Sequence, residues 1–202
     1  MRRRRAERAE AQRRGLPPAG AYAHAEGRGI VKKHLVLVGL PGAGKSTVGR
    51  LVAERLQTSF VDIDSILLRK EGKPITMIFA EKGEPAFREM ERKEVADALG
   101  HEPAVIVPGG GWAAQPGTLD DAKPRGYVIY LKARAELAAG RAAPSGTRPV
   151  LMGDDPVVEM RELFKTREPY YAQADATVQT EAKTPEQLAA EIVRLAQTSA
   201  GW

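Results

Sequence analysis

The segment GLPGAGKS at residues 39–46 constrains the fold more than any other part of the sequence. Its glycines, with Lys45 and Ser46, have the spacing of a phosphate-binding loop, in which backbone N–H groups surround phosphate oxygens and a Cβ would obstruct the approach. An apolar run precedes the segment, and a stretch of helical periodicity follows it from Val48 to Leu56. This order of strand, loop and helix N-terminus predicts a nucleotide site, against the alternative of a glycine-rich turn without a ligand.

Each residue type in this loop has a chemical task. Lys45 is expected to reach the β- and γ-phosphates and Ser46 to ligate Mg²⁺, while Gly42 and Gly44 let the backbone approach the anion. The sequence therefore predicts a nucleotide site at six residues of the loop and helix start: Gly42, Ala43, Gly44, Lys45, Ser46 and Thr47.

Short β-rich runs alternate with stretches able to form helices over the rest of the chain. The five runs lie around Leu35, Phe60, Val105, Val128 and Thr177. Such alternation is typical of a parallel sheet covered by helices on both faces. The expected fold class is therefore α/β, a P-loop NTPase-type three-layer α/β/α arrangement with a five-stranded parallel sheet.

Cap and turn residues predict where two helical regions begin or break. Thr184, Pro185 and Gln187 have the spacing of a capping box at the start of the last helix. The tripeptide at residues 83–85, Gly-Glu-Pro, divides the region between residues 74 and 100 into two helical segments.

Composition limits the classes of protein to which the chain can belong. It has 202 residues, no cysteine and three scattered histidines, so we expect one folded domain without disulfides or an intrinsic metal site. No apolar run reaches the length of a membrane span, and the N-terminus lacks a secretory signal. These features predict a cytoplasmic protein.

The net charge of +5 comes mainly from an arginine-rich stretch at residues 1–14. Residues 15–29 are rich in Pro, Gly and Ala and are typical of a linker. We expect residues 1–29 to form a disordered basic arm and linker, and residues 30–202 to form the folded domain. Binding of nucleic acid by the arm is an alternative, but arms without interleaved aromatic residues are more often solvated tails.

Two carboxylates, Asp62 and Asp64, follow the second apolar run in the sequence FVDID. As alternate residues of a strand they would share one face, at the end of the sheet where α/β proteins bind ligands. In isolation, a solvated strand end or a helix cap would explain them better. Beside a phosphate loop, Asp62 is expected to support Mg²⁺ through water, and Asp64 to accept a hydrogen bond from an acceptor hydroxyl.

The order of several motifs resembles the shikimate kinase family. The phosphate loop is followed by FVDID, by IFAEKGEPAFREME, by a triple glycine, by an Arg-Pro pair and by an arginine shortly before tyrosine, over about residues 33–197. No single motif is specific, because all such NTPases share the loop. Together they imply transfer of the γ-phosphoryl group of ATP to the 3-hydroxyl of shikimate, in aromatic amino-acid biosynthesis.

The resemblance implies which residues hold the acceptor. Arg88 and Arg167 are expected on the shikimate carboxylate and Asp64 on the hydroxyls, since bidentate guanidinium groups suit a planar carboxylate. We expect Glu91 to orient Arg88, against the alternative that Arg88 forms a surface ion pair. The loop after the third strand is expected to approach the ligand with bare backbone at Gly109, Gly110 and Gly111.

The segment at about residues 141–155 is small, polar and interrupted, which is typical of a mobile lid. The resemblance implies that Arg141 lies against adenine and that Arg148 reaches the transferring phosphate, where its charge would stabilise the phosphoryl oxygens. Without the resemblance, a loose connection with solvated arginines is the simpler interpretation. The expected catalytic residues are Lys45, Asp64 and Arg148.

Two other functions stay open at this point. The chain could be a related P-loop kinase acting on another polyhydroxy acid such as gluconate, or a nucleotide-binding module whose arm associates with nucleic acid. We expect instead a monomer with ATP and shikimate as its only partners and no membrane association. Residues 112–126 also lack the Asn-Arg pair that many members of the shikimate kinase family have in this segment. The sequence therefore does not show which residues support Gly111.

Overall fold

Five parallel strands form the centre of the structure, a computed structural model that describes residues 31–142 and 155–202. The strands pair in the order β2-β3-β1-β4-β5, and every pairing is parallel. They are β1 (His34–Val38), β2 (Phe60–Asp62), β3 (Val105–Val107), β4 (Gly126–Lys132) and β5 (Ala176–Gln179). The predicted α/β fold is therefore confirmed, with each of the five apolar runs in a strand. The arm at residues 1–29 and most of the predicted lid, Arg148 included, lie outside the described residues.

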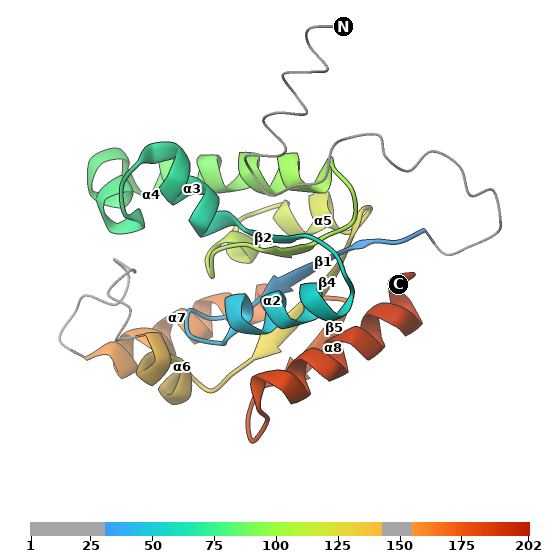
Figure 1. The fold of residues 1–202 in the computed structure, drawn as a ribbon. Coiled ribbons are helices and arrows are strands. Elements are labelled where there is room, and N and C mark those ends of the chain that lie inside the picture. The colour runs from blue at the N-terminus through green and yellow to red at the C-terminus, as the bar shows by residue number, and fades with distance from the viewer. Residues whose placement is uncertain (1–30, 143–154) are drawn as a thin grey trace, which may run out of the picture.

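Helices cover both faces of the sheet (Figure 1). On one face α2 (Lys45–Arg55) packs against α8 (Pro185–Ser199), and over the other lie α4 (Ile75–Leu99) and α5 (Thr118–Ala122). Right-handed crossovers explain this division, because the chain crosses the sheet in opposite directions after β1 and after β3. The remaining helical elements are α3 (Ile63–Glu71), the 3₁₀ turn η1 (Trp112–Ala114), α6 (Ala135–Ala142) and α7 (Pro156–Tyr171).

The two central strands form the most deeply buried part of the core. Leu35, Val36 and Leu37 of β1 are fully buried, as are Val128 and Ile129 of β4. Strands covered on both faces need such continuous aliphatic runs, and their packing gives the loops at the carboxyl edge a rigid base.

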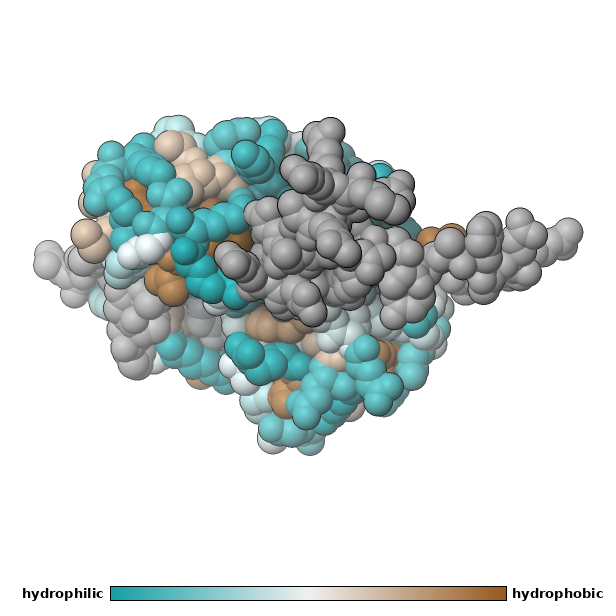
Figure 2. Space-filling view, turned by 45° about the horizontal axis from the view of Figure 1, so that its top comes forward, coloured by the Kyte–Doolittle hydropathy of each residue, from teal (hydrophilic) through white to brown (hydrophobic). Residues whose placement is uncertain are grey.

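On the face shown in Figure 2, hydrophobic residues are scattered among hydrophilic ones. Among the described helices, none has the length and apolar character needed to cross a membrane.

Local signals in the sequence also appear in the structure. The Thr184 hydroxyl accepts a hydrogen bond from Gln187 N, and the Gln187 side chain accepts one from Thr184 N, which confirms the capping box at the start of α8. Gly83 has φ 76° and ψ 166°, so α4 consists of two helical segments joined at this residue, as predicted.

His34, at the start of β1, makes the stability of the fold sensitive to acid. The residue is 3% exposed, and its Nδ1 atom accepts a hydrogen bond from Ala104 N. Burial lowers the pKa of His34 from 6.5 to about 4. Between these values the unfolded chain binds a proton that the folded protein does not bind, so stability falls as the pH drops from 6.5 toward 4.

We expect this residue to contribute about 3 kcal/mol to the loss of stability over that pH range. Chemical denaturation at pH 7, 5.5 and 4.5 would measure it, with His34→Gln as the non-titrating comparison. The variant should lose less stability on acidification than the unmodified protein. Equal losses would show that His34 does not carry this pH dependence.

Candidate active site

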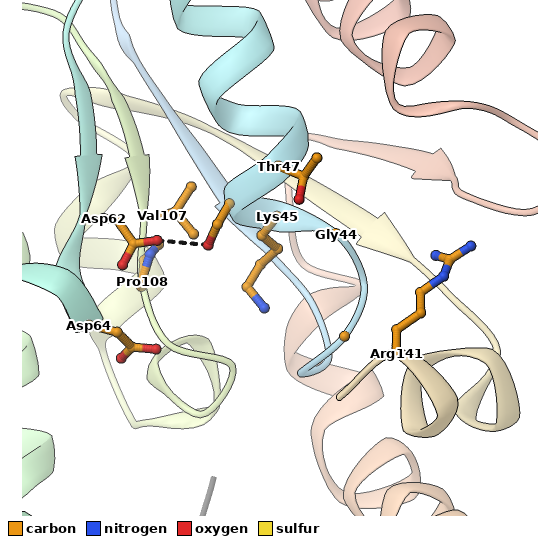
Figure 3. A pocket seen from close by; sticks show the side chains of 10 residues that line it. Gly44, Lys45, Thr47, Asp62, Asp64, Val107, Pro108 and Arg141 are labelled. Atoms are coloured by element: carbon orange, nitrogen blue, oxygen red, sulfur yellow. Dashed lines mark hydrogen bonds between the residues drawn. The ribbon is translucent and has the colours of Figure 1, made fainter. Parts of the chain in front are cut away.

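The loop between β1 and α2 curves around a hollow at the carboxyl edge of the sheet (Figure 3). Gly42 and Gly44 have φ angles of 78° and 92°, a left-handed conformation that glycine adopts without steric cost. A Cβ on Gly42 would also collide with the carbonyl group of Ala138 in α6. Backbone conformation and close packing therefore both require glycine at residue 42, as a phosphate loop needs.

Lys45, the first residue of α2, folds back over this loop. Its Nζ atom donates hydrogen bonds of 2.9 Å to the carbonyl oxygens of Gly39 and Leu40, and the residue is only 6% exposed. Phosphate oxygens are stronger acceptors for an ammonium group than neutral carbonyls are. The structure thus holds a cation inside the loop where a polyphosphate would bind.

The pocket in front of the loop has a volume of about 450 Å³, which is within the usual range for small-molecule sites. Ala43 is buried and is not among the lining residues. The sequence did not single out Val107, which ends β3, or Pro108, which follows it at the same edge of the sheet, where ligands bind. The pocket is lined by Gly42, Gly44, Lys45, Ser46, Thr47, Asp62, Asp64, Val107, Pro108 and Arg141.

Ser46 and Asp62 meet in this pocket. The Ser46 hydroxyl donates a 2.7 Å hydrogen bond to Asp62 Oδ2, drawn as the dashed line in Figure 3. A hydroxyl and a carboxylate side by side are the hard oxygen ligands that suit Mg²⁺ bound with nucleotide phosphates. In residues 31–142 and 155–202, no group of three or more His, Asp or Glu side chains could hold a metal ion.

The prediction that Asp62 and Asp64 alternate along one strand is wrong. β2 ends at Asp62 and α3 begins at Ile63, because the other oxygen of Asp62 accepts a 3.0 Å hydrogen bond from Ser65 N and caps the helix. Asp64 therefore lies in the first turn of α3. Both carboxylates still line the same pocket, so the helix start, and not the alternation of a strand, brings Asp64 there.

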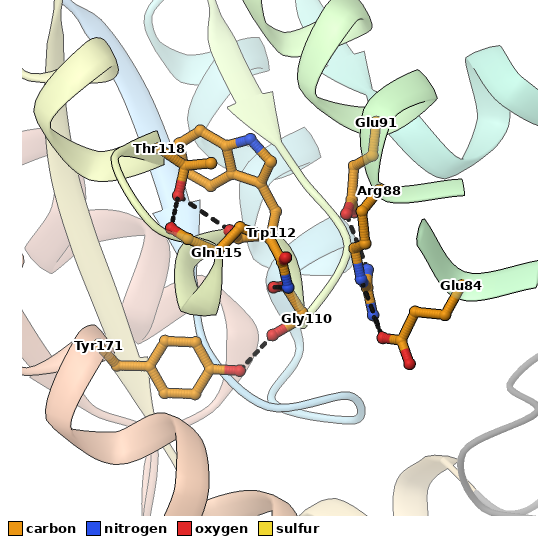
Figure 4. Close-up of polar contacts among 9 residues, drawn as sticks. Glu84, Arg88, Glu91, Gly110, Trp112, Gln115, Thr118 and Tyr171 are labelled. Carbon is orange, nitrogen blue, oxygen red and sulfur yellow. Dashed lines mark hydrogen bonds and ion pairs between the residues drawn. The ribbon is translucent and has the colours of Figure 1, made fainter. Parts of the chain in front are cut away.

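Arg88, in the second segment of α4, forms an ion-pair cluster with buried Glu91 and exposed Glu84 (Figure 4). Its guanidinium donates at 2.8 Å to Glu91, which is fully buried, and at 2.9 and 3.1 Å to Glu84. Burial acts to lower the pKa of Arg88, but the charges of Glu91 and Glu84 and their hydrogen bonds outweigh it and raise that pKa above its usual value. The cluster fixes the direction of Arg88, which is only 9% exposed; its pair with Glu91 is buried, and its pair with Glu84 reaches the surface.

The glycine loop at residues 109–111 contacts both the phosphate loop and Arg88. A Cβ on Gly110 would lie 2.9 Å from Pro41 Cδ, and a Cβ on Gly111 would lie 2.5 Å from Arg88 Cζ. A side chain at residue 110 would collide with the backbone of the phosphate loop, and one at residue 111 would displace the Arg88 guanidinium. The loop therefore connects the nucleotide side of the site to the Arg88 cluster.

Arg167 lies on α7, near its carboxyl end, and is 8% exposed. Among the described residues, no carboxylate lies within ion-pair distance of its guanidinium. A buried guanidinium without an acidic neighbour suits an anionic ligand, because pairing offsets the cost of removing its charge from water. Arg167 does not line the pocket at the phosphate loop, and Arg88 lines a separate hollow of about 390 Å³.

Comparison with known proteins accounts for this arrangement. A family model described as shikimate kinase matches residues 41–197. The chain belongs to the shikimate kinase family. The shikimate kinase of Persephonella marina is 41% identical over 161 residues, which span 80% of this chain and 97% of that protein. The shikimate kinase of Acinetobacter baumannii, solved in complex with shikimate, aligns with a TM-score of 0.80 at 35% identity over 84% of this chain and 95% of that one.

This member of the shikimate kinase family supports its glycine loop without the Asn-Arg pair. The Gln115 side-chain amide donates a 3.3 Å hydrogen bond to the Gly111 carbonyl. The Thr118 hydroxyl lies 2.9 Å from the carbonyl oxygens of both Trp112 and Gln115, and so closes the turn that follows (Figure 4). Residues that the sequence left unassigned thus support Gly111.

Proposed function

We infer that this protein transfers the γ-phosphoryl group of ATP to the 3-hydroxyl of shikimate, giving ADP and shikimate 3-phosphate. The observation that carries the inference is the pairing of Ser46 with Asp62 in the phosphate-loop pocket, with Asp64 lining the same pocket. Membership of the shikimate kinase family gives the class of acceptor.

The nucleotide side is built from the phosphate loop and α2. We assign the ATP phosphates to the backbone N–H groups of residues 42–44, to Thr47 and to Lys45, whose amine would exchange its carbonyl partners for β- and γ-oxygens. Ser46 and Asp62 would hold Mg²⁺, which neutralises phosphate charge when bound. Arg141, which lines the pocket, is the proposed contact for adenine, and Arg148 is the proposed contact for the transferring phosphate.

The acceptor side is built from the first turn of α3, the Arg88 cluster, the glycine loop and α7. We assign the shikimate carboxylate to Arg88 and Arg167, the two buried guanidinium groups of residues 31–142 and 155–202, and the hydroxyls to Asp64. The backbone of Gly109, Gly110 and Gly111 would pass against the substrate, since a side chain at residue 110 would collide with the phosphate loop and one at residue 111 would displace Arg88.

Asp64 has the chemistry to orient the 3-hydroxyl and to take its proton. As the hydroxyl oxygen bonds to the γ-phosphorus, the bond from that phosphorus to the β,γ-bridging oxygen breaks, and ADP leaves with the electron pair. Lys45 would stabilise the charge on the phosphoryl oxygens, which is the main contribution a protein makes to this reaction.

A coupled assay of ADP release with alternative acceptors tests the proposed function. Purified protein with ATP and Mg²⁺ should release ADP at a much higher rate with shikimate than with gluconate or with no acceptor. A preference for gluconate would instead support a kinase for another polyhydroxy acid.

The monomeric state, the cytoplasmic location and the lack of a nucleic-acid partner stay predictions. The alternative function, association with nucleic acid through the arm, has a specific signature. It would appear as salt-dependent RNA or DNA binding that disappears when residues 1–29 are deleted.

Replacing Arg167 by alanine should raise the KM for shikimate by about tenfold or more, because hydrogen bonds to charged groups contribute about 1.5–3 kcal/mol. The carboxylate does not change charge during transfer, so kcat and the KM for ATP should change little. Steady-state kinetics with each substrate varied in turn would measure the three constants.

Arg161→Ala is the matched control, because Arg161 lies on the same helix and pairs with Glu136 at the exposed surface. Arg88→Ala is less informative, since it removes the guanidinium that pairs with buried Glu91 and should destabilise the fold by about 3–5 kcal/mol. If Arg167→Ala raised only the KM for ATP, Arg167 would be assigned to the wrong ligand.

A further inference from the structure

The Tyr171 side chain joins α7 to the glycine loop. Tyr171 is fully buried, and its hydroxyl donates a hydrogen bond to the carbonyl oxygen of Gly110, 61 residues away in the sequence (Figure 4). Arg167 lies four residues before Tyr171 on the same helix, and Gly111, which contacts Arg88, is the residue after Gly110. The hydrogen bond therefore links the helix that carries Arg167 to the glycine loop that contacts Arg88.

The position of Tyr171 is itself fixed by β4. Its ring packs on Tyr130, with centroids 5.1 Å apart and planes inclined by 31°. The Tyr130 hydroxyl donates to the carboxylate of Glu168, which also pairs with Lys132 at 2.6 Å. Burial and the hydrogen bond to Glu168 raise the pKa of Tyr130, so this hydroxyl stays protonated and remains a donor. The last turns of α7 are thus held to the central sheet by polar and aromatic contacts.

The hydrogen bond to Gly110 also determines the direction of a neighbouring donor. Because a trans peptide group is planar, the carbonyl of Gly110 and the N–H of Gly111 point in opposite directions. Between two glycines this peptide group could turn over at little steric cost, which would reverse both directions. Within the described part of the chain, the Gly111 N–H donates to no acceptor, so it can serve a ligand. Tyr171 holds the peptide in one of its two orientations.

We propose that Tyr171 is a positioning residue for acceptor binding, which fixes the Gly110–Gly111 peptide and the spacing between α7 and the Arg88 cluster. Its hydroxyl acts through the backbone and through Arg167, without contact with the reacting atoms. This role rests on the proposed function, because it concerns how the same site binds the carboxylate-bearing acceptor. The nucleotide side is formed by other residues, so the effect should be confined to the acceptor.

Tyr171→Phe tests the role, since it removes the hydroxyl and keeps the ring that packs on Tyr130. We expect the KM for shikimate to rise about tenfold, with kcat and the KM for ATP within about twofold of the unmodified values. Tyr170→Phe is the matched control, because Tyr170 is adjacent, is 38% exposed and has no hydrogen bond through its hydroxyl to another described residue. Its constants should equal those of the unmodified protein.

The outcomes separate the two claims. If the unmodified protein showed no turnover that depends on shikimate, the proposed function would fail, and the positioning role with it. If the unmodified protein were active and Tyr171→Phe kept its KM for shikimate, or lost only kcat, the positioning role alone would fail. A Tyr171→Phe protein that did not fold, seen by circular dichroism, would also overturn it, since the hydroxyl would then be a requirement of folding.

Discussion

Replacing Lys45 by alanine should lower kcat by a factor of about 10² to 10³ or more while the protein stays folded. The amine donates hydrogen bonds to the backbone carbonyls of Gly39 and Leu40, so its loss removes a charge from the loop and leaves the apolar side chains of the core in place. With the amine absent, the oxygens of the transferring group lose a cation where their charge develops. Initial rates at saturating ATP and shikimate, beside circular dichroism spectra, would measure both effects.

Lys93→Ala is the control for this experiment, because Lys93 is an exposed lysine on α4, outside the phosphate-loop pocket. It should retain full turnover. Near-normal turnover in Lys45→Ala would contradict the assignment of residues 39–46 as the phosphate loop.

Replacing Asp64 by asparagine should abolish most turnover with ATP affinity nearly unchanged. Asparagine keeps the size of the side chain and can still bind a hydroxyl, but it cannot accept the proton that leaves as the oxygen attacks phosphorus. General-base groups of this kind contribute about 10² to 10⁴ in rate. Turnover measured beside nucleotide affinity would separate chemistry from binding.

Asp62→Asn supplies the comparison within the same pocket. Because Asp62 pairs with Ser46, its loss should raise the Mg²⁺ concentration needed for turnover, and excess metal should partly restore activity. The start of α3 should be little affected, since asparagine caps a helix about as well as the aspartate it replaces. Rescue of Asp64→Asn, but not of Asp62→Asn, by Mg²⁺ would mean that the two roles are reversed.

Features with a local cause could be predicted from the sequence. The apolar runs predict the five strands, and the capping residues Thr184 and Gln187 predict the start of α8. Gly83 and Pro85, which both disfavour helix, predict the break in α4. The phosphate loop was also predictable, because the glycines that let its backbone approach phosphate lie within a stretch of eight residues. Most of the predicted nucleotide-binding residues accordingly line one pocket.

Features that depend on tertiary contact could not be predicted. The change from strand to helix at Asp62 depends on one hydrogen bond, which Ser65 N donates to the Asp62 carboxylate. The sequence FVDID is equally compatible with a strand that ends at Asp62 and with one that continues to Asp64. The contact of Tyr171 with Gly110 joins residues far apart in the chain, and only the packing of α7 against η1 and the sheet brings them together. Gln115 likewise supports Gly111 through a turn within residues 112–126. The sequence of that segment did not predict this turn.

Identification of the reaction product tests the central claim most directly. After incubation of the protein with ATP, Mg²⁺ and shikimate, phosphorus and proton NMR of the mixture would locate the transferred phosphate. We predict one shikimate 3-phosphate for each ADP, with phosphorus coupled to the proton on C3. ADP formed without phosphorylated shikimate, or phosphate found on a different hydroxyl, would contradict the account.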